Sequence, residues 1–321
     1  MQHRRLLALG FYAGAVLIVT GVVGSWAWWC LGRRDPWLWT LRFLLLGPHA
    51  WTRPALISYW GLLALFSVAA WQRQLNRARR HRTYDVNPKK APAGSGRDSG
   101  SEAVASRVAT QMMDAADQRI PTLSINARRK SFHALAVAMF VPGIAIDPAF
   151  THLAFSVAFA AFTFVEYVRY FALWPFGRSI HLFLNEFIDH KDSGTAILSH
   201  FYLLAGSACP LWFEGQSRLL SLLGVLFLGI GDSMASIVGR KLGSTRWSPA
   251  SGKTAEGSLG FTVSVVGVAA VLWLVGAVEA FDLAAFTITT ALSTLLEAFS
   301  AQNDNLILPV YGWAIGTLLG V

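Results

Sequence analysis

Residues 229–257 read GIGDSMASIVGRKLGSTRWSPASGKTAEG, and strongly apolar sequence flanks them on both sides. The stretch contains a carboxylate at Asp232, an amine at Lys253 and a hydroxyl at Thr254, with several glycines between and beside them. Hard cations bind carboxylate oxygens, and a lysine beside exposed backbone amides can bind phosphate. We therefore predict that this stretch holds a nucleotide triphosphate and its metal close to a membrane surface.

The triplet Gly252-Lys253-Thr254 resembles the end of a P-loop, but the rest of that motif is missing. The pattern G-x-x-x-x-G-K-[ST] requires glycine at position 247, where the sequence has Trp247. A P-loop also follows a β-strand of a soluble α/β unit, whereas this stretch follows an apolar segment. The sequence therefore argues against a P-loop NTPase.

Composition places the chain among polytopic membrane proteins. Of its 321 residues 54% are hydrophobic and only 14% are charged, with 13 Trp and 21 Phe, and the mean hydropathy is +0.45. Soluble domains are less apolar. The two cysteines, Cys30 and Cys209, lie beside apolar residues without metal-ligand spacing, which argues against zinc and disulfide chemistry.

The formal net charge of +9 does not indicate a nucleic-acid partner. About half of the 27 Lys and Arg residues lie between positions 72 and 130, in a stretch that is also rich in Pro, Gly and Ser. No nucleic-acid-binding module accompanies this charge. We interpret the stretch as a cytosolic loop, and its low hydrophobicity predicts that most of it is disordered.

Apolar segments recur along the whole chain. A hydrocarbon core about 30 Å thick takes roughly 20 helical residues to cross. We therefore predict an all-α fold, a polytopic transmembrane helical bundle with about nine membrane spans. The first segment exceeds the h-region of a signal peptide, so we expect it to be retained. The predicted spans are residues 6–31, 55–71, 132–147, 149–168, 194–213, 219–240, 258–279, 283–301 and 305–321.

Three domains follow from this pattern: an N-terminal transmembrane hairpin of unknown role (1–71), a basic, largely disordered cytosolic linker (72–127) and a transmembrane catalytic candidate (128–321). Within the last, the amphipathic stretch 173–190 predicts a helix on the membrane surface. Positive-inside bias places residues 128–130, 169–193 and 240–257 on the cytosolic side. The orientation of the N-terminal hairpin stays open, because its connection contains Arg33, Arg34, Arg42 and Arg53.

The predicted order and orientation of the spans place four polar clusters at one face of the membrane. Ionisable residues at helix ends within a bundle are costly unless they are paired, hydrated or bound to a metal, so their convergence predicts a site that faces the cytosol. The clusters are Arg129 with His133; Glu166, Arg169, Asp192 and Ser193; Asp232 to Gly257; and Glu297 with Asn303, Asp304 and Asn305.

From about Arg129 to the C-terminus, the chain resembles the dolichol kinase family. The central stretch is similar to the CTP-binding signature of that family, D-x-x-A-x-x-x-G-x-x-x-G followed by K-T-x-E-G. One departure is Gly252-Lys253, where the family usually has two adjacent lysines, so one phosphate-facing charge is absent. Further matches occur, in order, at VPGI (141–144), FVEYVRYF (164–171), DSG (192–194), LSHFYLLAG (198–206) and LLEAFSAQNDNLILPVY (295–311).

The resemblance implies an enzyme of the endoplasmic reticulum membrane that transfers the γ-phosphoryl group of CTP to dolichol, with Mg²⁺ or Ca²⁺. Lys253 would contact the triphosphate, Asp232 and Asp304 would hold the metal, and Asp192 or Glu166 would orient the lipid hydroxyl or accept its proton. Membrane lipid and a second copy of the chain are further candidate partners. The implied nucleotide-binding residues are Asp232, Gly239, Gly243, Gly252, Lys253, Thr254, Glu256 and Gly257.

Each of these residues also has a structural interpretation that the sequence leaves open. Asp232, Thr254 and Glu256 could cap helices, and Lys253 could be an ordinary positive-inside residue. Glycines four residues apart, such as Gly239 and Gly243, are typical of close helix packing. Asp304 could form a turn with Asn305, and we expect His133 to be an interfacial histidine rather than a base.

Two other kinds of function remain as alternatives. One is a related CTP-using lipid kinase acting on diacylglycerol, phytol or farnesol, or a cytidylyltransferase acting on phosphatidate. The other is a polytopic transporter or a non-catalytic lipid-binding subunit, which Gly252 in place of a lysine would favour. The matches at 164–171 and 302–305 favour dolichol kinase.

Overall fold

A computed structural model describes residues 2–47, 49, 51–85, 125–185, 198–214, 217–248, 252–300 and 303–321. Within these ranges all regular structure is helical, apart from one isolated β-bridge between Arg246 and Thr254. The predicted all-α fold is thus confirmed for the described part of the chain. Residues 86–124 and 186–197 lie outside it, including most of the predicted linker and the predicted catalytic residue Asp192.

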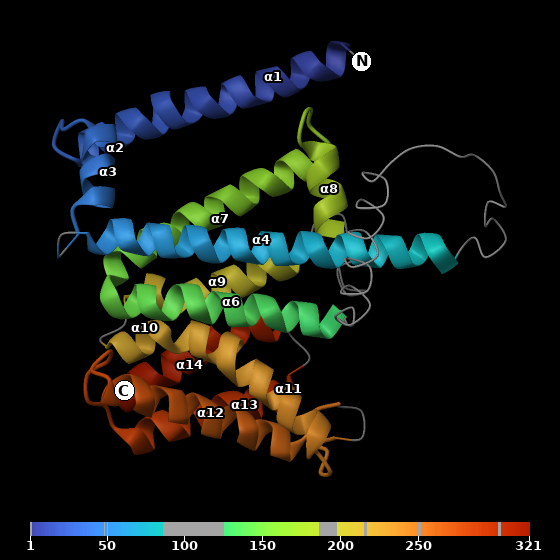
Figure 1. Ribbon diagram of the computed structural model, residues 1–321. Helices are drawn as coiled ribbons and strands as arrows, with labels where there is room; N and C mark the ends of the chain where they lie inside the picture. Colours follow the sequence, from blue (N-terminus) through green and yellow to red (C-terminus); the bar gives the residue numbers. More distant parts are fainter. Residues whose placement is uncertain are drawn as a thin grey trace, which may run out of the picture. The chain divides into compact units, whose positions relative to one another are not determined.

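Figure 1 shows the helices in their order along the chain. The N-terminal part contains α1 (Gln2–Leu17), the π-helix η1 (Ile18–Val23), α2 (Gly24–Cys30), α3 (Pro36–Leu45) and α4 (Thr52–Asp85). The remainder contains α6 (Ile125–Ile146), α7 (Pro148–Tyr170), α8 (Gly177–Asn185), α9 (Leu198–Trp212), α10 (Arg218–Val225), the π-helix η3 (Leu226–Gly231), α11 (Asp232–Lys241), α12 (Ala255–Leu274), α13 (Leu283–Phe299) and α14 (Asp304–Leu319).

The chain divides into two compact units, Met1–Trp60 with Arg129–Val321, and Gly61–Arg128. In the second unit, α4 continues to Asp85, beyond the predicted start of the linker at Gln72. The extra helical residues include Gln, Leu, Ala and several Arg, which favour helix even in polar sequence. A second boundary also differs: α8 begins at Gly177, after turns over 171–176, rather than at 173.

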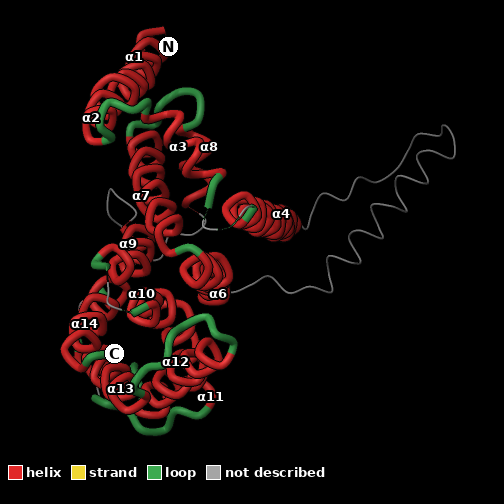
Figure 2. The backbone as a smooth tube through the Cα atoms, turned by 90° about the vertical axis from the view of Figure 1, so that its left-hand side faces the viewer, coloured by secondary structure: helices red, strands yellow, loops and turns green. Residues whose placement is uncertain are grey.

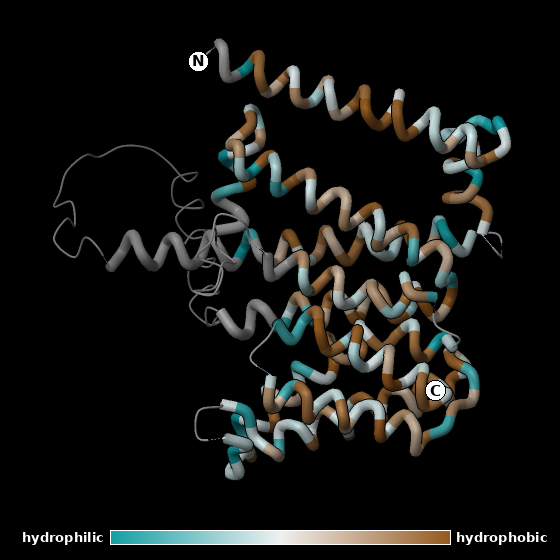
Figure 3. The backbone as a smooth tube through the Cα atoms, turned by 180° about the vertical axis from the view of Figure 1, so that it is seen from behind, coloured by the Kyte–Doolittle hydropathy of each residue, from teal (hydrophilic) through white to brown (hydrophobic). Residues whose placement is uncertain are grey.

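Five helical segments of the described residues are long and apolar enough to cross a membrane: Arg5–Cys30, Thr52–Ala70, Pro148–Tyr170, Arg218–Lys241 and Ala255–Leu274. The chain is therefore a helical membrane protein. Other predicted spans correspond to shorter helices; α14, for example, has 16 residues and is about 24 Å long. Hydrophilic residues gather near the helix ends and hydrophobic residues between them (Figure 3).

The best-buried part of the first unit is the continuous helical segment formed by α10 and η3. Every residue from Leu219 to Gly229 is buried. Helices α9, α12 and α14 pack around this segment (Figure 2). A helix that is apolar on all sides belongs in the centre of a bundle, so this segment forms the core against which the other helices are placed.

Glycines let the central helices approach without intervening side chains. A Cβ atom at Gly206 of α9 would overlap the backbone carbonyl oxygen of Asn305 in the first turn of α14, and one at Gly224 of α10 would overlap the carbonyl oxygen of Gly206. Such contacts are typical of membrane helices, which associate through backbone approach and van der Waals packing. Gly206 therefore sets how close the start of α14 lies to α9.

A buried ion pair holds the N-terminal hairpin to the turn between α6 and α7. The Arg53 Nε donates to Asp147 Oδ2 at 2.6 Å, and the two side chains are only 7% and 2% exposed. The guanidinium also donates to the carbonyl oxygens of Phe43 and Leu46, while Asp147 Oδ1 accepts from the backbone N–H of Phe150. The connection between α2 and α4 thus lies at the same end of the bundle as Asp147.

We predict that Gly206→Ala lowers the stability of the bundle, because the new methyl group overlaps the Asn305 carbonyl and forces α9 and α14 apart. Overpacking of this kind costs about 1–3 kcal/mol. The measurement is the midpoint of thermal unfolding in detergent, followed by tryptophan fluorescence. Gly267→Ala in α12 is the matched control, since no atom lies within 4 Å of the position that its methyl group would occupy; equal midpoints for the two variants would contradict the packing role of Gly206.

Candidate functional site

The loop between α11 and α12 folds back on itself and returns to the start of α12. The backbone N–H of Ala255 donates to the Thr245 carbonyl at 2.9 Å, and that of Trp247 donates to the Lys253 carbonyl at 3.2 Å. The Trp247 indole N–H also donates to Ser258 Oγ at 3.0 Å. These bonds give the two described arms of the loop, 242–248 and 252–254, a defined course, so that Lys253 is held on an ordered backbone.

Two residues of the predicted nucleotide site also stabilise this loop. Glu256 accepts from Ser244 Oγ at 2.6 Å and from the Thr245 N–H at 3.0 Å. Thr254 is the N-cap of α12, and its Oγ1 accepts from the Gly257 N–H at 3.1 Å. The capping role that the sequence left open for Thr254 is therefore confirmed, and Glu256 serves to tie the loop to α12.

The glycines of the predicted site differ in what surrounds them. A Cβ at Gly239 or at Gly257 would lie 3.0 Å from Thr254 Oγ1, and one at Gly243 would overlap the Gly239 carbonyl. These three glycines thus allow the close packing of α11 against the start of α12. Gly252 is different, because nothing lies within 4 Å of a Cβ built there, so glycine is not required by space at that position.

Lys253 joins the loop to the end of α13 and the start of α14. Its Nζ donates to Asp304 Oδ2 at 2.8 Å and to the backbone carbonyl of Glu297 at 2.6 Å, and it lies 3.5 Å from Glu297 Oε1. The lysine and Asp304 side chains are each about one third exposed. The amine is thus neutralised by acidic groups from two helices while remaining accessible from outside the protein.

Asp232 begins α11 where the π-helix η3 ends. Its Oδ2 lies 3.3 Å from Nδ1 of His133 on α6, and its carboxylate is 41% exposed. One turn earlier on α6, Lys130 Nζ donates to the Ser233 carbonyl at 3.1 Å. The Asp232 carboxylate also lies within electrostatic range of Glu297, which places it near the group that holds Lys253.

Three of the four predicted polar clusters are therefore brought together. His133, Asp232, Lys253 and Asp304 meet at one end of the helices, and Glu297 links them. Glu297 belonged to one of the clusters predicted from sequence but was not among the predicted site residues. Its signal was a carboxylate in the otherwise apolar segment 295–299, where a charge is costly without a partner.

The fourth cluster is described only in part. Glu166 and Arg169, one turn apart on α7, form a bidentate ion pair, with Arg169 Nε donating to Glu166 Oε2 at 2.7 Å and a second bond from Nη2 to Oε1. Both side chains are largely buried. Asp192 lies outside the described residues.

The donor chemistry at this end suits a hard divalent cation. Among the described residues no group of three or more His, Cys, Asp or Glu side chains is assembled as a metal site. Mg²⁺, however, typically takes one or two carboxylates and completes its shell with phosphate oxygens and water. Asp232 and Asp304, each more than a third exposed, are the two carboxylates that could supply this contribution.

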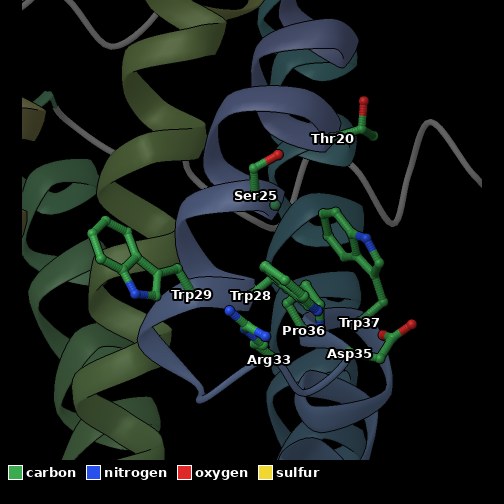
Figure 4. A pocket seen from close by; sticks show the side chains of 9 residues that line it. Thr20, Ser25, Trp28, Trp29, Arg33, Asp35, Pro36 and Trp37 are labelled. Atoms are coloured by element: carbon green, nitrogen blue, oxygen red, sulfur yellow. The ribbon is translucent and has the colours of Figure 1, made fainter.

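A recess of about 720 Å³ lies elsewhere, in the N-terminal hairpin. It is lined by η1, α2, α3 and the connection between α2 and α3, where Trp28, Arg33, Asp35 and Trp37 gather (Figure 4). Arg33 stacks over the Trp28 ring at 5.8 Å. Tryptophans beside an arginine are typical of the membrane–water interface, and this recess shares no residue with the polar cluster around Lys253.

Comparison with known proteins shows which sequences this chain is similar to. Residues 116–289 match the family model described as dolichol kinase. The chain is 35% identical over 315 residues to the dolichol kinase of Mus musculus, covering 94% of this chain and 51% of that protein. It is 43% identical over 200 residues to dolichol kinase sec59 of Schizosaccharomyces pombe, covering 60% and 39%, and 39% identical over 194 residues to dolichol kinase EVAN of Arabidopsis thaliana, covering 58% and 34%. No solved structure matches the chain.

The chain thus spans about half the length of the mouse relative, or less in the other two. The match to the mouse protein includes nearly all of this sequence, and the family model includes the loop with Lys253, together with Asp232 and His133. The chain belongs to the dolichol kinase family.

Proposed function

We propose that this protein phosphorylates dolichol, using CTP as the phosphoryl donor. The observation that carries the proposal is the position of Lys253, an accessible amine held between Asp304 and Glu297 at the polar end of an apolar bundle. A nucleotide triphosphate from water and a hydroxyl on a membrane lipid can meet only at such a boundary. The names of the relatives support dolichol as the acceptor and a kinase as the enzyme class.

In the proposed reaction Lys253 exchanges part of its contact with Asp304 for the triphosphate. The lipid hydroxyl oxygen forms a bond to the γ-phosphorus, the bond from that phosphorus to the bridging oxygen breaks, and CDP leaves. The hydroxyl proton passes to a carboxylate, for which Asp192 and Glu166 are the candidates from sequence. Phosphoryl transfer depends mainly on positioning and on neutralising charge, which an amine on a tethered loop provides.

A divalent cation, Mg²⁺ or Ca²⁺, would neutralise the charge that develops on the phosphate oxygens. Asp232 and Asp304 would hold it, and release of Asp304 from Lys253 would make an oxygen of that carboxylate available. Gly239, Gly243 and Gly257 keep α11 and α12 in close contact, so that the backbone around Lys253 can approach the nucleotide. Gly252 leaves space for the phosphate at this point.

We further infer that the chain lies in the endoplasmic reticulum membrane with its polar end on the cytosolic side. We also infer that it crosses this membrane about nine times. The shorter helices would count as crossings because α6, α9, α13 and α14 each connect the two ends of the bundle. The polar end carries Lys130, Arg240, Lys241 and Arg246. At the other end Arg53 and Arg218 are paired with Asp147 and Glu279. Because Arg33, Arg34 and Arg42 also lie at that end, in the connection between α2 and α4, the inferred orientation rests on the segment from α6 to α14.

The activity is tested with the purified full chain in detergent, CTP labelled on its γ-phosphate, Mg²⁺ and a panel of lipid alcohols. We expect labelled dolichyl phosphate, with CTP preferred over ATP and GTP. Label found only on diacylglycerol, phytol or farnesol would show a different lipid kinase. CTP binding without any labelled lipid would show a non-catalytic subunit.

Lys253→Ala is predicted to lower the rate of phosphoryl transfer in this assay about 100-fold or more. Loss of one group that stabilises transition-state charge typically lowers kcat by this factor. Unchanged thermal unfolding and an unchanged gel-filtration profile would show that the variant is folded. Lys241→Ala is the matched control, an exposed lysine at the end of α11, and should keep full activity. Full turnover by Lys253→Ala would refute the phosphate role.

Membrane orientation predicts which positions react with a membrane-impermeant maleimide. In a background with Cys30 and Cys209 replaced by alanine, Gly252→Cys in sealed microsomes should react without detergent, because the cytosolic face is outermost. Glu279→Cys, at the other end, should react only after the membrane is opened. The opposite pattern would place Lys253 in the lumen, away from cytosolic CTP.

A further inference from the structure

The contact between His133 and Asp232 has no role in the function proposed so far. The imidazole of His133 is 5% exposed, and its Nδ1 lies 3.3 Å from Asp232 Oδ2. This approach lacks the alignment of a hydrogen bond, so the buried nitrogen has no hydrogen-bond partner among the described residues. A buried polar atom without a partner is costly, which indicates that the contact is completed in another state of the site.

The backbone is arranged to bring these two side chains together. A Cβ at Gly229 would overlap the Val137 side chain and would lie 3.4 Å from the His133 carbonyl, so only glycine allows α6 to lie this close to η3. The wide π-helical turn of η3 ends directly at Asp232, and such turns are frequent at functional sites. The Lys130 bond to the Ser233 carbonyl holds α6 to the start of α11, one turn away along α6.

The geometry points to His133 as a positioning residue for Asp232, an inference that rests on the proposed function. When one oxygen of the Asp232 carboxylate turns outward to bind a divalent cation, the Nδ1–H of His133 donates to the other oxygen and stops the carboxylate from rotating. Residues that hydrogen-bond a metal ligand orient it in this way, and their loss typically weakens metal binding about 10- to 100-fold. His133 does not touch the nucleotide or the lipid in this arrangement.

The surroundings explain why histidine suits this position. Lys130 on the same helix already uses its amine to bind the Ser233 carbonyl, and Arg240 lies within electrostatic range of Lys130. A further flexible cation would compete with the metal for Asp232. The imidazole instead offers one N–H on a rigid ring, fixed by burial between α6 and η3.

The test measures Mn²⁺ binding to the purified full chain with CTP, by the loss of the electron paramagnetic resonance signal of free Mn²⁺. His133→Leu removes the donor and should weaken Mn²⁺ binding about 10- to 100-fold. His133→Asn places an amide N–H close to the position of Nδ1 and should keep the affinity within a few-fold of the native value. His133→Gln places its amide near the position of Nε2 instead and should behave like His133→Leu.

The pair His133→Asn and His133→Gln keeps the test independent of folding, because both side chains are polar and similar in size. Native affinity in His133→Gln or His133→Leu, or equal loss in His133→Asn, would overturn the positioning role. Asp232→Ala separates this inference from the proposed function. If Asp232→Ala weakens Mn²⁺ binding while His133→Leu does not, only the inference fails; if Asp232→Ala binds Mn²⁺ normally, the proposed metal role of Asp232 fails as well.

Discussion

The 2.8 Å bond between Lys253 and Asp304 joins two parts of the chain that are far apart in sequence. A charge near the apolar part of a membrane protein is tolerated only with a partner, and Lys253 has acidic partners from both α13 and α14. This constraint fixes where the loop after α11 can lie and where α14 must begin. The candidate site is thus a consequence of how the bundle satisfies its charges.

The packing of the bundle serves the same arrangement. Gly206 allows the carbonyl of Asn305 to approach α9, and Asn305 follows Asp304 directly. The buried segment 219–229 leads into Asp232 without a break. Both proposed metal-binding carboxylates are therefore attached to helices that are positioned by close contact with the core, which gives these groups defined places before any ligand is bound.

The all-helical class of the described residues and five of the predicted membrane spans could be predicted from the sequence, because helix formation and apolar length are local properties. Asp232, Lys253 and Asp304 were predicted to lie at one end of the bundle, and they do. The contact of His133 with Asp232 could not be predicted, because it depends on a π-helical turn and on the approach of α6 at Gly229. The end of α4 was placed too early, because its arginine-rich sequence is polar enough for a linker and yet favours helix.

The first helical segment has a physical property that the rest of the bundle does not share. Only 6% of the most apolar 18-residue window of the span Arg5–Cys30 is buried, and its contact with α7 includes the stacking of Phe11 on Phe164 at 5.8 Å. Its 26 residues are about 39 Å long, longer than a hydrocarbon core of about 30 Å, and a helix accommodates such a mismatch by tilting, kinking or locally thickening the bilayer. A change in bilayer thickness would therefore act mainly on this helix, which few protein contacts hold, and least on the fully buried segment from Leu219 to Gly229.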